Sequence, residues 1–316
     1  MAGSEFELID RFFRRASRRD DVVLGIGDDA AVLRVPPQRE LVVALDTLNE
    51  GVHFLPQTAP SDVGHKALAV NLSDLAAMGA EPAWLTLSLS IPRYDEQWLA
   101  AFADGLFSLA DRYGMALVGG DTTRGPLSVS VQVQGFVEPG SVLRRSGAKP
   151  GEAVMVSGSL GDAALALRQL KSGAAADKAL LARLNRPEPR VELGRRLAAL
   201  ASAAIDVSDG LLADLGHVLQ ASGCGARLQL DSLPRSASFA ACSESDAWDL
   251  QLAGGDDYEL CFTVEPSRIA KVEAAAAGLG VAVTRIGEIE AAPGIRCVTA
   301  NGALYEPSLR GWDHFG

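Results

Sequence analysis

Segments with a strand-like alternation of side chains follow one another along this chain, with helix-like segments between them. In the first half, residues 84–91 and 127–137 alternate apolar and polar side chains, as half-buried strands do. The helical periodicity of residues 61–79 and 95–113 predicts helices beside them. Long, antiparallel-looking strands mixed with helices favour an α/β chain of the α+β kind over a doubly wound parallel sheet.

A length of 316 residues predicts about two domains. The boundary is expected at 145–152, RSGAKPGE, where Gly, Pro and Lys occur without apolar periodicity. We therefore expect an N-terminal domain over 1–146 and a C-terminal domain over 147–316. Further strands are predicted at 41–48 (a buried strand), 153–158, 258–264 and 283–289, and further helices near 160–172, 178–184, 190–202 and 208–222.

Composition narrows the class of protein and its partners. Hydrophobic residues make up 48% of the chain and charged residues 22%, which is typical of globular proteins. No apolar run reaches the roughly 20 residues of a membrane helix. The net charge of −11 argues against a nucleic-acid partner. The first residues contain no signal-peptide core, and the four cysteines form no CxxC pair, so we expect a cytoplasmic protein.

Aspartates recur at the ends of apolar or glycine-rich runs. A buried carboxylate without a partner costs several kcal/mol or becomes protonated. Divalent cations resolve this conflict, and magnesium is typically held by a few carboxylates together with substrate phosphates. The pattern therefore predicts a phosphate site with several metal ions. The motifs are GIGDDA (25–30), ALDT (44–47), NLSDL (71–75), VGGDTT (118–123), AIDVSDG (204–210) and AGGDDY (253–258).

Each motif taken alone also has a purely structural interpretation. Asp74 and Asp209 follow serines at expected helix starts, and Asp28 with Asp29 would suit a turn. The GIGDDA segment fits a dinucleotide-binding pattern, with Asp46 near the ribose position. That pattern must open a helix, whereas VLRVPP follows here. The P-loop, the GxSxG elbow, HExxH and the EF-hand loop are all absent from the sequence.

The motifs as a set resemble those of one enzyme family. They are GIGDDAA, LDTLNEGVHF, KALAVNLSDLAAMGAEPAW, VGGDTTRGP, RRSGAKPGE, IDVSDGL, GGDDYEL and GWDHF, in this order. Together they are similar to the bacterial thiamine-monophosphate kinases, within the aminoimidazole-ribonucleotide-synthetase-like (PurM-like) superfamily. The resemblance covers essentially the whole chain.

The resemblance implies a homodimer of two-domain chains in which the N-terminal mixed sheets build a β-barrel. It also implies ATP-dependent phosphorylation of thiamine monophosphate to thiamine diphosphate, by direct in-line transfer with several Mg²⁺ ions. Both substrates would bind between the domains, and no membrane or nucleic acid is involved.

The resemblance also assigns roles to individual residues. The metal ligands would be Asp29, Asp46, Asp74, Asp121, Asp206 and Asp209, of which Asp74, Asp121 and Asp209 are the expected catalytic residues. Those that contact ATP would be Gly120, Asp121, Arg145 and Ser208. Those that face the acceptor would be His53, Asp256 and Trp312. Two departures occur: Ala44 and Leu45 replace hydroxyl residues of the family, and Asp256 stands where many members have Glu.

Other interpretations compete with this one. A related ATP-dependent synthetase is one, but selenophosphate synthetases need a Cys or selenocysteine near the N-terminus, and Cys224 is the first here. A non-catalytic nucleotide or thiamine sensor is another, although a sensor has no need of so many acidic groups. Without the resemblance, we would interpret His53 as a surface histidine, Trp312 as an anchor that docks the C-terminal segment, and Arg145 as a charge in the linker.

Overall fold

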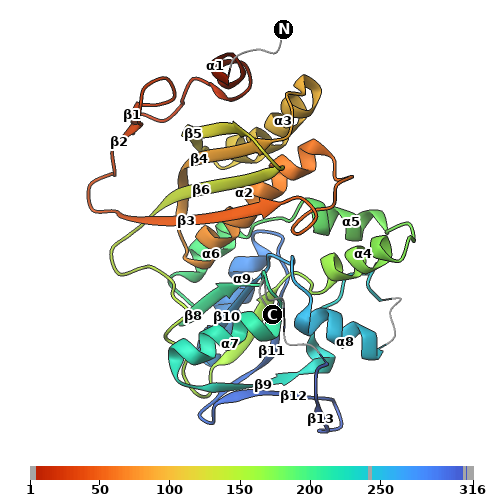
Figure 1. The fold of residues 1–316 in the computed structure, drawn as a ribbon. Coiled ribbons are helices and arrows are strands. Elements are labelled where there is room, and N and C mark those ends of the chain that lie inside the picture. The colour runs from red at the N-terminus through yellow and green to blue at the C-terminus, as the bar shows by residue number, and fades with distance from the viewer. Residues whose placement is uncertain (1–4, 241–243, 309–310, 312–316) are drawn as a thin grey trace. The chain divides into compact units, whose positions relative to one another are not determined.

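The computed structural model describes residues 5–240, 244–308 and 311. The chain divides into two compact units (Figure 1). The N-terminal unit comprises the chain up to Leu75 together with Ala80–Gly140, and the C-terminal unit comprises Ala76–Gly79 together with the chain from Ser141. Each unit combines helices with a sheet, which confirms the expected α/β class.

The N-terminal unit is built on an open, four-stranded mixed sheet with the order β3-β6-β4-β5. β6 pairs antiparallel with both β3 and β4, whereas β4 and β5 are parallel. The strands predicted from alternation, β4 and β6, lie at the centre of this sheet. The strands are β3 (Glu40–Asn49), β4 (Glu81–Ile91), β5 (Ala116–Arg124) and β6 (Ser128–Val137).

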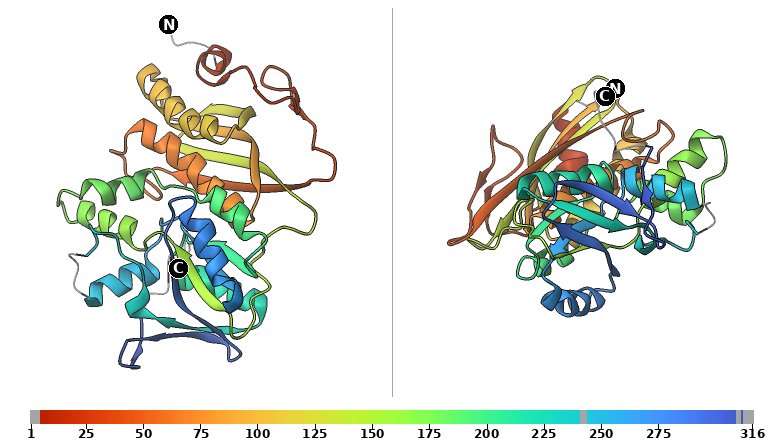
Figure 2. Two further views of the ribbon diagram at one scale, coloured as in Figure 1. Left: turned by 180° about the vertical axis from the view of Figure 1, so that it is seen from behind. Right: turned by 90° about the horizontal axis from the view of Figure 1, so that it is seen from below.

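Two helices, α2 (Pro60–Ala77) and α3 (Glu96–Arg112), lie on one face of this sheet, as the views from the front and from behind show (Figures 1 and 2). They cross at close range because each contributes a glycine at the contact. A Cβ atom on Gly64 would lie 2.1 Å from the carbonyl oxygen of Phe102, and one on Gly105 would lie 1.9 Å from that of Ser61.

The segment predicted as a buried strand, 41–48, forms the edge strand β3 instead. Leu41, Val43 and Leu45 are 45%, 52% and 58% exposed, so the prediction of burial was wrong. The reason lies in the alternation of side chains along a strand. Leu48, on the opposite face, is buried, while the three outward-facing residues meet no layer within the described chain.

A short hairpin and a helical segment precede the sheet in the chain. The hairpin pairs β1 (Val22–Leu24) antiparallel with β2 (Val32–Leu33), and its loop is the GIGDDAA segment. The helical segment before it consists of α1 (Glu5–Leu8) and a π-helical turn, η1 (Ile9–Phe13). Phe13 anchors this segment, since it is buried and meets Phe102 of α3 edge-on.

The C-terminal unit contains a seven-stranded sheet with the order β13-β12-β9-β11-β7-β10-β8. All neighbouring pairs are antiparallel except β12 with β9. The strands are β7 (Ala153–Ser157), β8 (Ala203–Asp206), β9 (Gly225–Gln229), β10 (Leu260–Val264), β11 (Val283–Glu290), β12 (Gly294–Val298) and β13 (Leu304–Tyr305).

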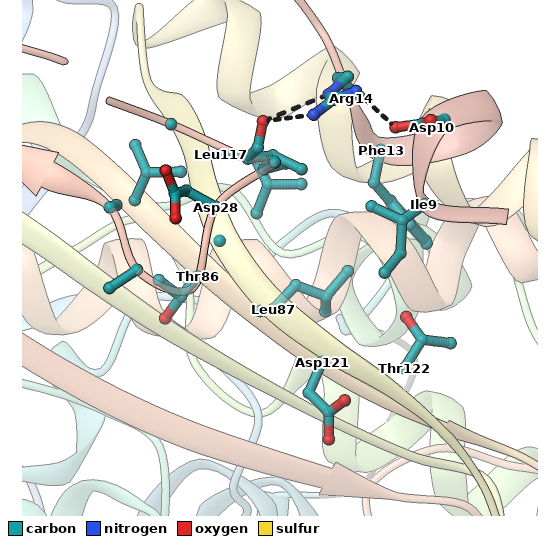
Figure 3. A pocket seen from close by; sticks show the side chains of 18 of the residues that line it. Ile9, Asp10, Phe13, Arg14, Asp28, Thr86, Leu87, Leu117, Asp121 and Thr122 are labelled. Atoms are coloured by element: carbon teal, nitrogen blue, oxygen red, sulfur yellow. Dashed lines mark hydrogen bonds and ion pairs between the residues drawn. The ribbon is translucent and has the colours of Figure 1, made fainter. Parts of the chain in front are cut away.

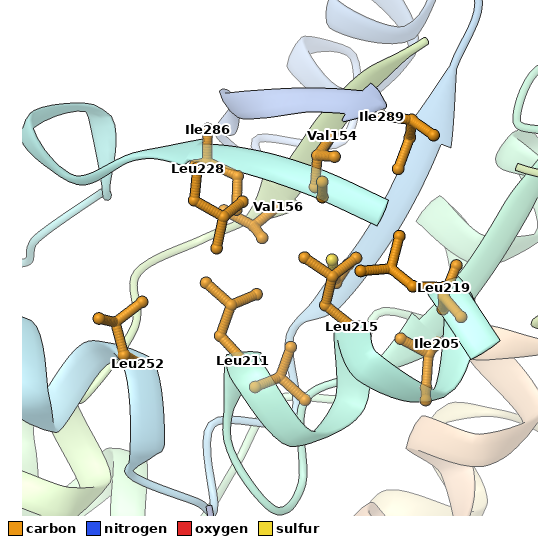
Figure 4. Close-up of a cluster of buried hydrophobic side chains, with 14 of the residues drawn as sticks. Val154, Val156, Ile205, Leu211, Leu215, Leu219, Leu228, Leu252, Ile286 and Ile289 are labelled. Carbon is orange, nitrogen blue, oxygen red and sulfur yellow. The ribbon is translucent and has the colours of Figure 1, made fainter. Parts of the chain in front are cut away.

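Helices α7 and α9 lie on opposite faces of this sheet (Figures 1 and 2). Leu211, Leu215 and Leu219 recur every fourth residue of α7 and pack against the sheet residues Val154 and Val156 (Figure 4). The helices of the unit are α4 (Asp162–Lys171), α5 (Lys178–Asn185), α6 (Val191–Leu197), α7 (Leu211–Ser222), α8 (Glu244–Ala253) and α9 (Ile269–Ala277), with 3₁₀ turns η2 (Leu230–Ser232) and η3 (Pro266–Arg268).

Two helical predictions need correction. The helix expected over 190–202 ends at Leu197, and Ala203 already begins β8, because this apolar run pairs with β10. Asp74 does not lie at a helix start, since α2 begins at Pro60 and Asp74 occupies its last turn. No helix in the described part of the chain has the length and apolar character needed to cross a membrane.

A buried ionic network joins the GGDDYEL motif to two helices of the C-terminal unit. Glu259 is fully buried and accepts hydrogen bonds from Arg183 at 2.7 Å, from Arg190 twice at 2.6 Å, and from Ser157 at 2.5 Å. Both carboxylate oxygens of its neighbour Asp257 accept from the backbone N–H of Gly161, the N-cap of α4. Burial raises the pKa of Asp257 well above its ordinary value.

Glu259→Gln is expected to lower the free energy of unfolding by roughly 3 kcal/mol, because it leaves two arginines without their carboxylate. The loss stays near the lower end of the usual range, since the side chains of Arg183 and Arg190 remain 20% and 16% exposed. Urea denaturation measures the loss. Glu192→Gln, which breaks an exposed pair with Arg195, is the control and should cost less than about 1 kcal/mol. Equal effects of the two substitutions would contradict this assignment.

Candidate active site

The GIGDDAA loop is fixed at its base by one aspartate. Asp21 accepts a hydrogen bond from the indole Nε1 of Trp84 at 2.9 Å and two from Arg19 at 2.9 and 2.6 Å. Burial raises the pKa of Asp21, but these hydrogen bonds outweigh it, so the pKa lies below its ordinary value. Val22 and Leu33 pack beside this base against the apolar cluster that contains Trp84. The hairpin therefore holds its loop against the sheet.

A cavity of about 720 Å³ lies between this loop, the helical segment that precedes it, and strands β4 and β5 (Figure 3). Its size is within the range of small-molecule sites. Asp28, Asp29 and Asp121 line it, so the structure brings together two of the sequence motifs. Among the described residues that line the cavity, Arg14 is the only cationic side chain, and it already pairs with Asp10.

Gly120, which precedes Asp121 on β5, occupies a position that only glycine fits. Its φ angle is +152°, and a Cβ atom there would lie 1.9 Å from the carbonyl oxygen of Leu87 on β4. The strand register shifts just before this point, between Leu85 and Thr86. Gly120 thus permits the close strand contact that places Asp121 at the cavity.

The other two predicted metal ligands of the N-terminal unit, Asp46 and Asp74, do not line this cavity. Asn71 connects them: its Oδ1 accepts from the backbone N–H of Asp46 at 3.0 Å, and Asp74 lies three residues further along α2, on the same side of the helix. Asn71 itself is fully buried and donates to the carbonyl of Ala67 at 3.0 Å. A buried amide therefore holds β3 and α2 in register at these carboxylates.

Asp46 and Asp121 lie on strands of the same sheet that are not neighbours. Strands β6 and β4 lie between β3 and β5, so about 14 Å of sheet separates the backbones of the two residues. In the described part of the chain, no group of three or more His, Cys, Asp or Glu side chains is arranged to hold a metal ion.

His53 lies in a tightly bonded turn between β3 and α2. Its backbone N–H donates to the carbonyl of Asn49 at 3.0 Å, and its ring Nδ1 accepts from the N–H of Asn49 at 2.9 Å. The neutral imidazole must therefore carry its proton on Nε2. Lys66 of α2 donates to the carbonyl of His53 at 3.0 Å with 1% of its surface exposed. The turn thus holds the imidazole in a defined orientation rather than as a loose surface group.

In the C-terminal unit, an aspartate that the sequence analysis did not single out organises the DVSDG loop. Asp214, in the first turn of α7, accepts with one oxygen from the backbone N–H groups of Ser208, Asp209 and Gly210 at 3.0, 3.0 and 3.1 Å. Burial, and then repulsion from Asp206 and Asp209, raises the pKa of Asp214 to about 7. An acid four residues after the glycine of DVSDG was the available sequence signal.

The same loop contacts the GGDDYEL motif. The N–H of Asp256 donates to the carbonyl of Ser208 at 2.8 Å, and the hydroxyl of Tyr258 donates to the Asp256 carboxylate at 3.0 Å. Asp256 has a φ of +68°, a strained value for a residue other than glycine. A Cβ atom on Gly311 would lie 3.0 Å from the carbonyl oxygen of Asp209, so the chain passes this loop just before Trp312. Trp312 itself lies outside the described residues.

Arg145 does not lie beside the DVSDG loop and Asp256. Its carbonyl accepts from the hydroxyl of Ser222, the last residue of α7, whereas Ser208 and Asp209 precede the first turn of that helix. A helix of 12 residues spans about 18 Å. Of the predicted residues, the C-terminal unit therefore brings together Asp206, Ser208, Asp209 and Asp256, with Arg145 at the far end of α7.

Gly120→Ala should lower the melting temperature by several degrees, because the added Cβ atom collides with the backbone of β4. Gly119→Ala is the matched control, since a Cβ atom there would find Thr86 only at 4.0 Å. Thermal unfolding followed by circular dichroism compares the two variants. Similar melting temperatures for both would show that the contact does not restrict residue 120.

The stability of the metal-free protein should fall as pH rises from about 4 to about 7. The folded-state pKa of Asp214 (about 7) lies above its unfolded value of about 3.9, so the folded chain retains a proton that the unfolded chain has lost. Asp214→Asn should reduce the loss between pH 5 and 8 by about 2–3 kcal/mol in urea titrations with a chelator.

The control for this experiment is Asp231→Asn, which alters an exposed aspartate of the same unit and should leave the pH dependence unchanged. If wild-type protein and the Asp214→Asn variant lost stability equally over this range, Asp214 would not be the titrating group.

Comparisons with known proteins find relatives that match along the whole chain. The model of the AIR synthase related protein, N-terminal domain, matches residues 27–137, and that of the AIR synthase related protein, C-terminal domain, matches residues 149–299. A thiamine-monophosphate kinase of Salmonella typhimurium is 48% identical over 100% of this chain and 99% of its own.

Two solved structures extend the similarity to the fold. The thiamine-monophosphate kinase of Stenotrophomonas maltophilia K279a superposes with a TM-score of 0.88 at 52% identity, over 93% of this chain and 96% of that one. AaThiL complexed with AMPPCP and TMP gives a TM-score of 0.78 at 32% identity, over 92% of each chain. This chain, with its two-unit PurM-like α/β fold, belongs to the thiamine-monophosphate kinase family.

Proposed function

We propose that this chain transfers the γ-phosphoryl group of ATP to thiamine monophosphate and so forms thiamine diphosphate. The observation that carries the proposal is the match to thiamine-monophosphate kinases along the full length of the chain. A relative that is 32% identical has been solved with both AMPPCP and TMP, which are an ATP analogue and the acceptor. The cavity beside the GIGDDAA loop supplies carboxylates suited to a metal-bound polyphosphate.

The donor groups of this chain suit magnesium. Asp28, Asp29 and Asp121 present carboxylate oxygens at a cavity whose described lining holds no lysine. In the C-terminal unit, burial and then repulsion from Asp206 and Asp209 raise the pKa of Asp214, so three acidic groups lie close together there. We assign Asp29, Asp46, Asp74, Asp121, Asp206 and Asp209 as the metal ligands. Magnesium bound there would neutralise the charge of the phosphates during transfer.

The remaining roles are proposed from the family motifs. Gly120 and Asp121, Ser208 and Arg145 are assigned to ATP, and Gly120 allows the backbone to approach a phosphate closely. His53, Asp256 and Trp312 are assigned to the acceptor. With its proton on Nε2, the His53 ring is suited to donate a hydrogen bond to an acceptor phosphate.

We propose that the N-terminal domain, residues 1–146, binds ATP and magnesium and forms a homodimer. The outward face of β3 supports this role, because Leu41, Val43 and Leu45 form a row of exposed apolar side chains on an edge strand. A second copy of the chain would cover this row and extend the open sheet toward a barrel. The C-terminal domain, residues 147–316, supplies the other acceptor and nucleotide contacts.

We also place the enzyme in the cytoplasm. The cysteines of the described chain, Cys224, Cys261 and Cys297, are free and buried, as expected in a reducing compartment.

The test of the function is product analysis after the protein is mixed with Mg²⁺, ATP and thiamine monophosphate. We expect thiamine diphosphate with inversion at a chiral γ-phosphorus, because the acceptor phosphate is already ionised and needs alignment rather than a base or an enzyme nucleophile. Retention, or labelled protein after incubation with ATP alone, would indicate a phosphoenzyme. Absence of thiamine diphosphate would refute the function.

Asp121→Asn and Asp74→Asn should each lower kcat by at least about 100-fold, the scale of losing a positioned electrostatic contact. Chelation of magnesium should abolish turnover of the wild-type protein. Asp104→Asn on the exposed side of α3 is the control and should retain wild-type kcat. Steady-state kinetics with circular dichroism checks all three variants. Near wild-type turnover in both test variants would remove the metal assignment of these residues.

A further inference from the structure

Arg14 connects the N-terminal helical segment to the tip of the GIGDDAA loop. Its Nε and Nη2 both donate to the carbonyl oxygen of Ile26, at 3.2 and 2.9 Å. Its Nη1 pairs with the carboxylate of Asp10 at 2.9 Å, one helical turn earlier (Figure 3). The nitrogens of the guanidinium are therefore directed to the loop carbonyl and to Asp10, which balances the charge.

The loop tip is shaped to receive this guanidinium. Gly27 has a φ of +127°, and a Cβ atom at this position would lie 1.8 Å from Nη2 of Arg14. The missing side chain of Gly27 therefore provides the space in which the guanidinium reaches Ile26. The next two residues, Asp28 and Asp29, are exposed and line the cavity.

The loop is thus held at two places. At its base, Asp21 is bonded to Trp84 and Arg19, and at its tip the Ile26 carbonyl is bonded to Arg14. Gly25 and Gly27 flank Ile26 at the tip, and glycine gives the backbone wide conformational freedom there. Without the bond at the tip, the base alone would leave the two aspartates free to move relative to β5.

We propose that Arg14 is a positioning residue of the nucleotide site, which holds the GIGDDAA loop so that Asp28 and Asp29 stay at the cavity that Asp121 also lines. This inference rests on the proposed function in that the cavity receives a magnesium-bound nucleotide. Arg14 acts through the Ile26 carbonyl, and Asp10 acts through Arg14 by fixing the orientation of the guanidinium. Arg14 therefore binds the loop and does not itself contact the ligand.

The first measurement is amide hydrogen exchange of the unliganded full-length protein. Arg14→Ala should raise exchange at least about 3-fold in peptides covering residues 25–31, while exchange in β4 and β5 stays unchanged. Arg15→Ala is the matched control. Its side chain is about as exposed as that of Arg14 (44% against 46%), but it covers Phe107 and pairs with Asp111, so the loop should be unaffected.

The second measurement is calorimetric binding of AMPPCP in the presence of Mg²⁺. Arg14→Ala should raise the Kd by roughly 10- to 100-fold, the range for losing hydrogen bonds from a charged group. Arg14→Lys should not restore binding, because one ammonium cannot bond Ile26 and Asp10 in the same geometry. Asp10→Ala should raise the Kd less, and adding Asp10→Ala to Arg14→Ala should change nothing further.

Unchanged exchange of residues 25–31 in the Arg14→Ala variant would overturn the inference. So would raised exchange with an unchanged Kd, rescue of binding by Arg14→Lys, or an equal effect of Arg15→Ala. A wild-type protein that binds no magnesium–AMPPCP would overturn it as well. If the wild type binds this nucleotide but forms no thiamine diphosphate, the proposed function fails, and the two measurements still decide the role of Arg14.

Discussion

Both units have to hold several carboxylates in place although these groups repel one another. In the C-terminal unit, burial and then repulsion from the nearby Asp206 and Asp209 raise the pKa of Asp214 to about 7. The chain offsets this cost with three backbone N–H groups directed at a single oxygen of Asp214. These donors also complete the start of α7, so the same bonds stabilise the helix and hold the acidic loop.

The N-terminal unit meets the same constraint by separating its acidic groups and fixing the backbone beneath each one. Asn71 holds β3 beside α2 at Asp46, and Gly120 allows β5 to approach β4 at Asp121. None of these contacts neutralises a carboxylate. They fix the backbone beneath each carboxylate, which is the preorganisation expected of a site that binds a charged ligand.

The sequence predicted the elements whose pattern is local and missed the features that depend on distant partners. The strands at 84–91 and 127–137 were predicted because their apolar and polar side chains alternate. Both lie inside a sheet whose two faces differ in burial. The exposure of Leu41, Val43 and Leu45 on β3 depends on whether another layer covers that face of the sheet, and no periodicity encodes that. The end of α6 at Leu197 depends likewise on pairing of the following run with β10.

The candidate site divides in the same way. The pattern of aspartates beside glycines singled out the GIGDDA and VGGDTT motifs. In the structure Asp28, Asp29 and Asp121 of these motifs line one cavity. Asp214 and Glu259 were missed because their partners are backbone groups and arginines that only the folded chain brings to them. The family motif RRSGAKPGE assigns Arg145 to ATP. In the structure the carbonyl of Arg145 is bonded to Ser222 at the end of α7.

The exposed apolar row of β3 also bears on how the chain avoids misassembly. LVVAL at 41–45 combines high strand propensity with no charge, which is the character of segments that pair with one another in incompletely folded chains. Glu40 and Asp46 flank it directly and act as gatekeepers, since stacking copies of this segment in register would stack their charges. The charge of Asp46 therefore opposes in-register stacking of this segment, in addition to any role that Asp46 has in the folded enzyme.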